Sequence, residues 1–185
     1  MQHEADDAPG GAEQVRLTRV EACQWEALRQ LARTVWREHY ASIVSRAQID
    51  FMLGERMKDA SLAALEQQPG HELAVLWQGA RAVGYCGSGP AEETGTFKLG
   101  QLYLLAEVRG RGWGKRMLEH VERRAGEARA ERLVLQVNKQ NGSAIDFYRR
   151  QGFVVREAAV FDIGNGFVMD DYVMEKPLAG ILPGG

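Results

Sequence analysis

The 185-residue sequence lacks the features of several specialised protein classes. Its longest apolar runs, such as 73–77, are strand-sized, whereas a membrane-spanning helix needs roughly 18 or more apolar residues. Its two cysteines, Cys23 and Cys86, are far apart, with no CxxC spacing and no clustered histidines, so neither a disulfide framework nor a structural zinc site is indicated. With 23 Lys and Arg against 25 Asp and Glu, it also lacks the basic excess of nucleic-acid binders. We therefore expect a cytoplasmic protein with no bound metal, no nucleic-acid partner and no membrane segment.

The two ends of the chain differ from the middle. Residues 1–14 hold four acidic residues, no Lys or Arg and almost nothing to bury, which predicts a disordered acidic tail. Without this tail the remainder is slightly basic, as suits an anionic cofactor. We expect one domain at 15–178 and a flexible tail at 179–185.

Apolar periodicity predicts the elements of this domain. Strands are expected at 15–20, 72–77, 81–87, 96–105, 133–137, 154–163 and 169–176. Helices are expected at 25–40, 47–57, 60–67, 113–130 and 141–150. The glycine-containing turns at 78–80 and 164–166 join strands into hairpins. The pattern predicts an α/β (α+β) fold with a single mixed, mostly antiparallel, twisted sheet of about seven strands and about four to five helices on its faces.

A glycine cluster at 109–115, RGRGWGK, lies between a predicted strand and the strongest predicted helix. Backbone N–H groups and a helix dipole at such a place can hold phosphate, although three glycines can also simply form a tight turn. A Walker A loop is excluded because Arg109 and Arg116 occupy positions that it needs for Gly and Ser or Thr. The dinucleotide pattern GxGxxG fails because Lys115 stands at its third glycine.

Two segments carry a family resemblance. The pattern Arg/Gln-x-x-Gly-x-Gly/Ala occurs at Arg109, Gly112 and Gly114, and VNKQN at 137–141 is followed by AIDFYRRQGF at 144–153. Together they resemble the pyrophosphate loop and the asparagine-tyrosine segment of the GCN5-related N-acetyltransferase (GNAT) superfamily. The resemblance extends in order from the first strand to Lys176. More loosely, the sequence around 36–40 and 169–174 is similar to the polyamine-acetylating branch.

The resemblance implies acetyl-CoA as cofactor. It assigns a set of residues to the pantetheine arm and the pyrophosphate: Leu102, Tyr103, Leu104, Arg109, Gly110, Arg111, Gly112, Trp113, Gly114, Lys115 and Asn141. It makes Tyr148 the general acid that protonates the departing CoA thiolate. Asn141 also suits a helix N-cap, and Tyr148 also suits an interior aromatic position.

The implied activity is transfer of acetyl from acetyl-CoA to a primary amine by direct attack through a tetrahedral intermediate. We favour a small-molecule amine. A protein N-terminal or lysine acetyltransferase and a noncatalytic acyl-CoA-binding regulatory module stay open as alternatives. Where relatives frequently carry a glutamate base, this chain has Gly100 or Gln101, and Gln136 on the next strand. An amide cannot take a proton, so Gln101 can at most orient a water.

Six residues are candidates for the acceptor site: Trp36, His39, Tyr40, Gln101, Asp170 and Asp171. The aspartates would attract a cationic amine, although such a doublet can also be a strand-edge charge. Helical aromatics such as Trp36 more often fill a core. The acceptor, the base, the length of the acyl group and a homodimer stay open.

Overall fold

The computed structural model describes residues 14–178, so the predicted tails at 1–13 and 179–185 lie outside the described residues. Seven strands form one sheet: β1 (Val15–Arg19), β2 (Glu72–Gln78), β3 (Arg81–Pro90), β4 (Thr96–Leu104), β5 (Arg132–Asn138), β6 (Val154–Gly164) and β7 (Phe167–Pro177). Their order is β1-β2-β3-β4-β5-β7-β6, and every neighbouring pair is antiparallel except β4 and β5. The predicted mixed, mostly antiparallel sheet is confirmed.

Five α-helices accompany the sheet: α1 (Trp25–Tyr40), α2 (Arg46–Arg56), α3 (Asp59–Gln67), α4 (Trp113–Glu127) and α5 (Gly142–Arg150). Two short 3₁₀ turns, η1 (Ala22–Gln24) and η2 (Ala106–Val108), precede α1 and the glycine loop. Helix α4 ends three residues before the predicted boundary because Arg129 adopts a left-handed conformation with φ of 56°. The N–H of Ala130 then bonds to the carbonyl of Ala125, a Schellman-type stop.

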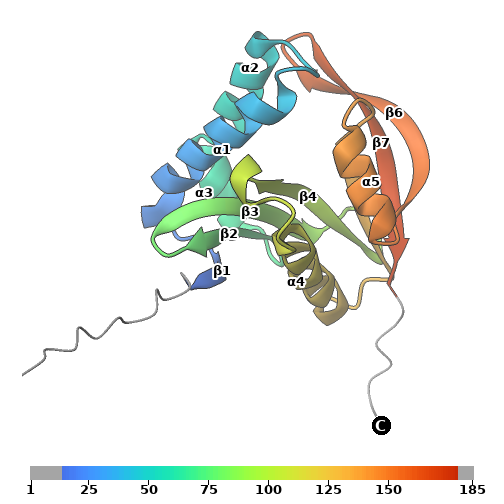
Figure 1. Ribbon diagram of the computed structural model, residues 1–185. Coiled ribbons are helices and arrows are strands. Elements are labelled where there is room, and N and C mark those ends of the chain that lie inside the picture. Colours follow the sequence, from blue (N-terminus) through green and yellow to red (C-terminus); the bar gives the residue numbers. More distant parts are fainter. Residues whose placement is uncertain (1–13, 179–185) are drawn as a thin grey trace, which may run out of the picture.

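The helices cover the two faces of the sheet (Figure 1). On one face, α1 contributes Trp36, whose indole N–H donates to the hydroxyl of Tyr85 on β3 at 2.7 Å. On the other face, α4 buries Met117, Leu118 and Val121 completely or nearly so. Lys176 on β7 reaches the same side and pairs with Glu122 of α4 at 2.7 Å. Each face therefore has its own packed layer.

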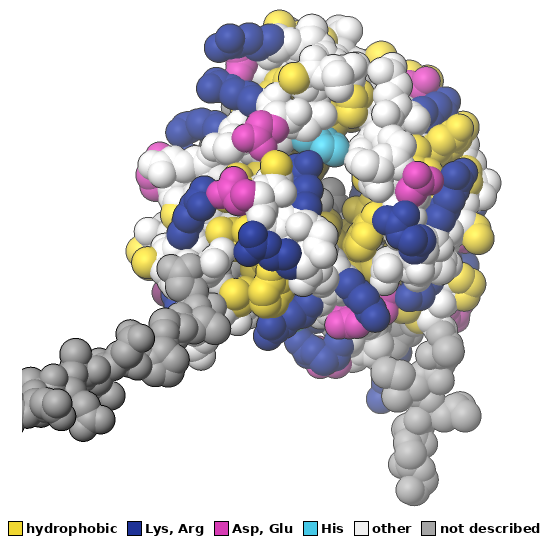
Figure 2. Space-filling model, in the orientation of Figure 1, with side chains coloured by type: hydrophobic (Ala, Val, Ile, Leu, Met, Phe, Trp, Pro, Cys, Tyr) yellow, Lys and Arg dark blue, Asp and Glu magenta, His cyan; other side chains and the backbone are white. Residues whose placement is uncertain are grey.

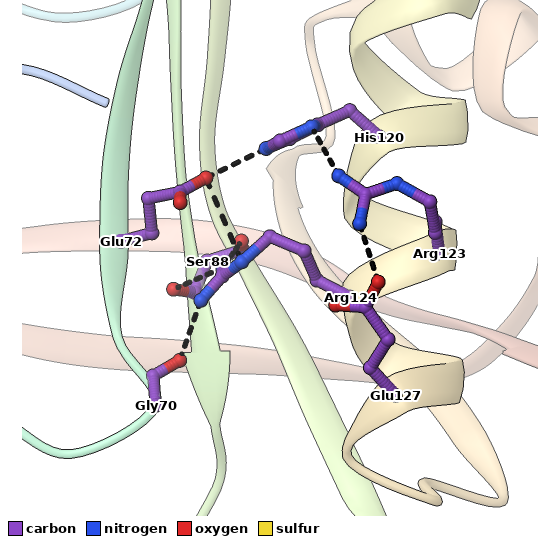
Figure 3. Close-up of polar contacts among 7 residues, drawn as sticks. All are labelled: Gly70, Glu72, Ser88, His120, Arg123, Arg124 and Glu127. Carbon is purple, nitrogen blue, oxygen red and sulfur yellow. Dashed lines mark hydrogen bonds and ion pairs between the residues drawn. The ribbon is translucent and has the colours of Figure 1, made fainter. Parts of the chain in front are cut away.

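A polar network anchors α4 to the sheet (Figure 3). His120 lies 2.6 Å from the carboxylate of Glu72 on β2, and this hydrogen bond is the main reason why the pKa of Glu72 is lowered. Arg124 donates to the hydroxyl of Ser88 on β3 at 2.7 Å and to the carbonyl of Gly70 at 2.8 Å. These bonds fix the position of α4, and with it the glycine loop at its start.

The sheet splits between β4 and β5. These strands pair only along Thr96–Leu99 and Arg132–Leu135; further on, β4 stays with β3 up to Leu104, and β5 stays with β7 up to Asn138. The β3–β4 register shifts at this point, so that Gly100 is an extra, bulged residue in β4. Residues 100–104 therefore present an edge without a β5 partner.

Within residues 14–178, no helix combines the length and apolar character needed to cross a bilayer. The same residues hold no group of three or more His, Cys, Asp or Glu side chains that could bind a metal ion.

Candidate active site

A cleft of about 410 Å³ occupies the split between β4 and β5. Its walls come from both strands, from the glycine loop, from α5 and from the end of α1. Figure 2 shows a hollow in this face of the molecule, with Lys and Arg side chains gathered around it. The cleft lies along an open strand edge and has basic side chains around it, which suits an anionic ligand.

The glycine loop forms one end of the cleft. Gly110 and Gly112 have φ of 74° and 82°, and a Cβ added at either would meet nothing within 4 Å. Gly112 is also the N-cap residue of α4, so the unpaired N–H groups of the first turn of this helix point out of the loop. This open concave turn at a helix N-terminus fits a pyrophosphate. The predicted phosphate site is therefore chemically suited to acetyl-CoA.

Not every loop residue predicted for the cofactor lines the cleft. Gly114 and Lys115 do, whereas Arg111 is exposed outside it and Trp113 is half-buried beneath Arg116. Arg109 lines the cleft, but its Nε and Nη2 donate to the carbonyl of Leu104 at 3.1 and 3.0 Å. These hydrogen bonds of Arg109 hold the glycine loop against the end of β4, a structural role that the sequence did not reveal.

Tyr148 lies inside the cleft on α5. Its ring packs edge-on against Phe147 and Phe153, and the side chain is 8% exposed. Among the described residues the hydroxyl has no hydrogen-bond partner. Burial raises the pKa of Tyr148 well above its usual value of 10, so the phenol keeps its proton at neutral pH. The phenol can therefore donate a hydrogen bond to a ligand in the cleft.

Asn141 performs two functions at the start of α5. Its side-chain oxygen caps the helix by accepting from the N–H of Ala144 at 3.2 Å. Its amide nitrogen donates to Nε2 of His39 at 2.7 Å, so the imidazole proton is on Nδ1. Burial and the nearby charge of Arg109 lower the pKa of His39 and keep it neutral. A neutral bridge thus joins α1 to α5 at the mouth of the cleft.

The predicted acceptor residues separate into two groups. His39, Tyr40 and Gln101 line the cleft, and the hydroxyls of Tyr40 and Tyr103 lie 2.8 Å apart. Trp36 does not line it: at 1% exposure it belongs to the core, because its indole N–H is satisfied by Tyr85 rather than by a ligand.

The aspartate doublet also lies outside the cleft lining. Asp170 is exposed and pairs with Lys139, whereas its neighbour Asp171 points to the opposite face because successive strand residues alternate. Asp171 is 7% exposed, and its Oδ1 has no hydrogen-bond partner among the described residues. Burial, followed by the charge of Asp170, raises the pKa of Asp171 to about 6.

Among the lining residues that were missing from the predicted site are Asn138, Ser143 and Phe147. All three occur in or beside the segments that carry the family resemblance. Sequence spacing places them near Asn141 and Tyr148 along the chain, but only the split between β4 and β5 shows which of their neighbours face a cleft.

A split sheet with a glycine loop and a helix N-terminus at its open edge defines an acyl-CoA-dependent acyltransferase fold. A family model described as "Acetyltransferase (GNAT) family" matches residues 25–153. The chain therefore belongs to the GNAT acetyltransferases, the predicted family, whose cofactor is acetyl-CoA.

Individual proteins of known sequence or structure also resemble this chain. A curated relative, the 5-NmdU N-acetyltransferase of Pseudomonas phage PaMx11, is 42% identical over 65 residues, which are 35% of this chain and 42% of the relative. The match thus spans less than half of that protein. The crystal structure of PaiA N-acetyltransferase from Thermoplasma acidophilum in complex with coenzyme A has a TM-score of 0.74 at 21% identity, over 89% of this chain and 99% of that one. The ribosomal-protein-S18-alanine N-acetyltransferase of Escherichia coli has a TM-score of 0.66 at 15% identity, over 93% and 100%. At these identities the two structures show the shared fold.

Proposed function

We propose that this protein transfers the acetyl group of acetyl-CoA to the primary amine of a small molecule. The observation that carries the proposal is a single cleft that holds the glycine loop, an unpaired strand edge and the protonated phenol of Tyr148. When bound, acetyl-CoA supplies the acetyl group and a thiolate leaving group.

The chain's own groups suit the two halves of this ligand. The first-turn N–H groups of α4 and the charge of Lys115 would bind the pyrophosphate at Gly110 and Gly112. The unpaired edge of β4 at 102–104 offers N–H and C=O groups to the amides of the pantetheine arm, as a sheet edge does to an added strand. An N–H of the same edge can donate to the acetyl oxygen as negative charge develops there.

Tyr148 would supply the proton that the sulfur needs. A thiol has a pKa of about 8.5 and the phenol remains protonated, so its O–H can donate to the departing sulfur. The Tyr148 hydroxyl has no hydrogen-bond partner within the described part of the chain and lines the cleft, so it is free to bond to a ligand there. Its presence supports catalysis over the alternative of a noncatalytic regulatory module.

The proton of the amine leaves by a different route. Among the lining residues no carboxylate is present, and the amides of Gln101 and Gln136 cannot take a proton. We propose that Gln101 orients a water that carries this proton to solvent, in place of the glutamate that relatives frequently carry.

An amine panel tests the proposal. Purified protein with acetyl-CoA is offered polyamines, amino acids, short peptides and the 5-NmdU acceptor of the phage relative, and free thiol is measured. We expect release above background with at least one small amine. If calorimetry shows CoA binding but thiol is released only with peptides, the acceptor is a protein; if nothing promotes release, the enzyme proposal fails.

A further inference from the structure

The side of the cleft covered by α1 is a distinct surface where an acceptor can approach. The register pairs Tyr103 with Tyr85 and Gln101 with Gly87, so these β4 side chains share the face that α1 packs on. Nζ of Lys98 donates to Oε1 of Gln136 across the base of the split at 2.9 Å, which places Gln136 on this face too. The glycine loop and α5 lie toward the other face.

The side chains that line this surface hydrogen-bond but carry no charge. They comprise three carboxamides, two phenols and the neutral imidazole: Gln101, Gln136, Asn138, Tyr40, Tyr103 and His39. Gln136 is exposed and Gln101 is half-buried. Within residues 14–178, no side chain hydrogen-bonds to the side-chain amide of Gln101. Both amides therefore have donors and acceptors to offer a ligand.

The charged side chains nearest to this surface lie behind the amides of Gln101 and Gln136, and they are not predominantly negative. Lys98 stands behind Gln136 and has no ion-pair partner among the described residues. The charges of Arg56, Asp171 and Glu92 all act on it. A polyamine would bring two or more ammonium groups, each of which loses hydration and needs a carboxylate in return. Two set-back carboxylates that are balanced by two cations do not meet that need.

We propose that the acceptor is a monoamine whose body carries a neutral amide, imide or lactam group, bound by Gln101 and Gln136, and that polyamines are poor acceptors. The inference rests on the proposed function. Carboxamides suit this class because they offer an N–H donor and a C=O acceptor side by side, which matches an amide or imide edge.

Four amines of equal chain length separate the possibilities: 4-aminobutanamide, butylamine, 4-aminobutanoate and 1,4-diaminobutane. They differ only in the far group, which is amide, methyl, carboxylate or ammonium. Their kcat/KM is measured by thiol release and their Kd by calorimetry with the CoA-bound protein. We expect the amide to bind and react about tenfold better than the diamine, the value of one to two net hydrogen bonds.

Two substitutions assign the preference to these residues. Gln101→Glu, nearly isosteric, places a carboxylate on this surface and should shift the ratio of diamine to amide about tenfold toward the diamine. Gln136→Glu at an exposed position should shift it in the same direction, which covers the case that the first variant folds poorly. Gln140→Glu, the same change at an exposed residue outside the cleft lining, should leave the ratio unchanged.

The results distinguish this inference from the proposed function. If thiol is released but the diamine is preferred, or if the ratio ignores both glutamates, the inference is overturned while the enzyme stands. If no amine promotes release although CoA binds, the proposed function fails, and the four Kd values still decide the inference. Equal or undetectable binding of all four overturns it.

Discussion

Asp171 allows a quantitative prediction because its carboxylate is buried without full hydrogen bonding. The residue is 7% exposed, its Oδ1 lacks a partner among the described residues, and burial raises its pKa from 3.8 to about 6. The folded protein therefore binds a proton more tightly than the unfolded chain. Between these two pKa values, stability falls as pH rises, because the folded state must give up a proton that the unfolded state has already lost.

The magnitude follows from the same numbers. At 1.36 kcal/mol per pKa unit, a rise from 3.8 to about 6 makes the ionised form cost about 3 kcal/mol above pH 6 and almost nothing below pH 4. Asp171→Asn removes the charge and this pH dependence. Its amide brings its own unmet hydrogen-bonding need, so the slope with pH is more informative than the absolute stability.

Denaturant unfolding between pH 4 and pH 7 measures this slope. Relative to Asp171→Asn, the wild type should lose about 3 kcal/mol over the range, as an upper value. Asp146→Asn is the control: that carboxylate is exposed, pairs with Arg149 and is not among the charges that act on Asp171, so its removal should change the slope by less than about 1 kcal/mol. Parallel pH profiles for the wild type and Asp171→Asn would refute the reasoning.

Three further predictions concern the cleft and its frame. Tyr148→Phe should lower kcat by ~10²–10⁴-fold with CoA affinity unchanged, and the deficit should shrink as pH rises past the thiol pKa of about 8.5; a normal kcat at neutral pH, with chemistry limiting, would reduce the residue to packing. Gly112→Asp should abolish CoA binding in calorimetry, whereas Gly166→Asp, which also has a positive φ and open space, should bind normally; equal affinities would disprove the phosphate loop. Gly84→Ala should destabilise the protein by about 1–3 kcal/mol in denaturant unfolding, because the new Cβ would collide with the Leu104 side chain and lie 2.9 Å from the carbonyl of Tyr103. Gly54→Ala is the control and should not destabilise the protein, since its new Cβ would have nothing within 4 Å. Equal effects of the two substitutions would contradict this packing.

Local pattern was enough to find the elements, because the alternation in β1 and the apolar stripe of α1 are properties of short segments. Helix ends were less predictable. The end of α4 depends on the left-handed conformation of Arg129, which no residue type at that place signals.

The site could be predicted only where a contiguous motif carries it. Gly112 and Tyr148 occur within such motifs, and the structure places both in the cleft. Trp36 and Asp171 were proposed from residue type, and burial decides against both as lining residues, since each depends on contacts with strands far away in sequence. The proposed acceptor surface could not be predicted either, because Gln101 and Gln136 line one cleft only through the arrangement of two strands.

The split between β4 and β5 follows from the pairing of each strand with its other neighbour. A Cβ at Gly100 would lie 3.7 Å from the carbonyl of Gly87 on β3, which is an ordinary contact. Strand β4 stays bonded to β3 and β5 to β7 beyond the last shared pair, while Lys98 and Gln136 close the base. Because the strands are already separated by these bonds, a ligand entering the cleft would break no β4–β5 hydrogen bond. Asn141 on α5 and His39 on α1 both line the cleft and are hydrogen-bonded to each other at 2.7 Å, so a ligand that passes between these two helices would have to break that bond.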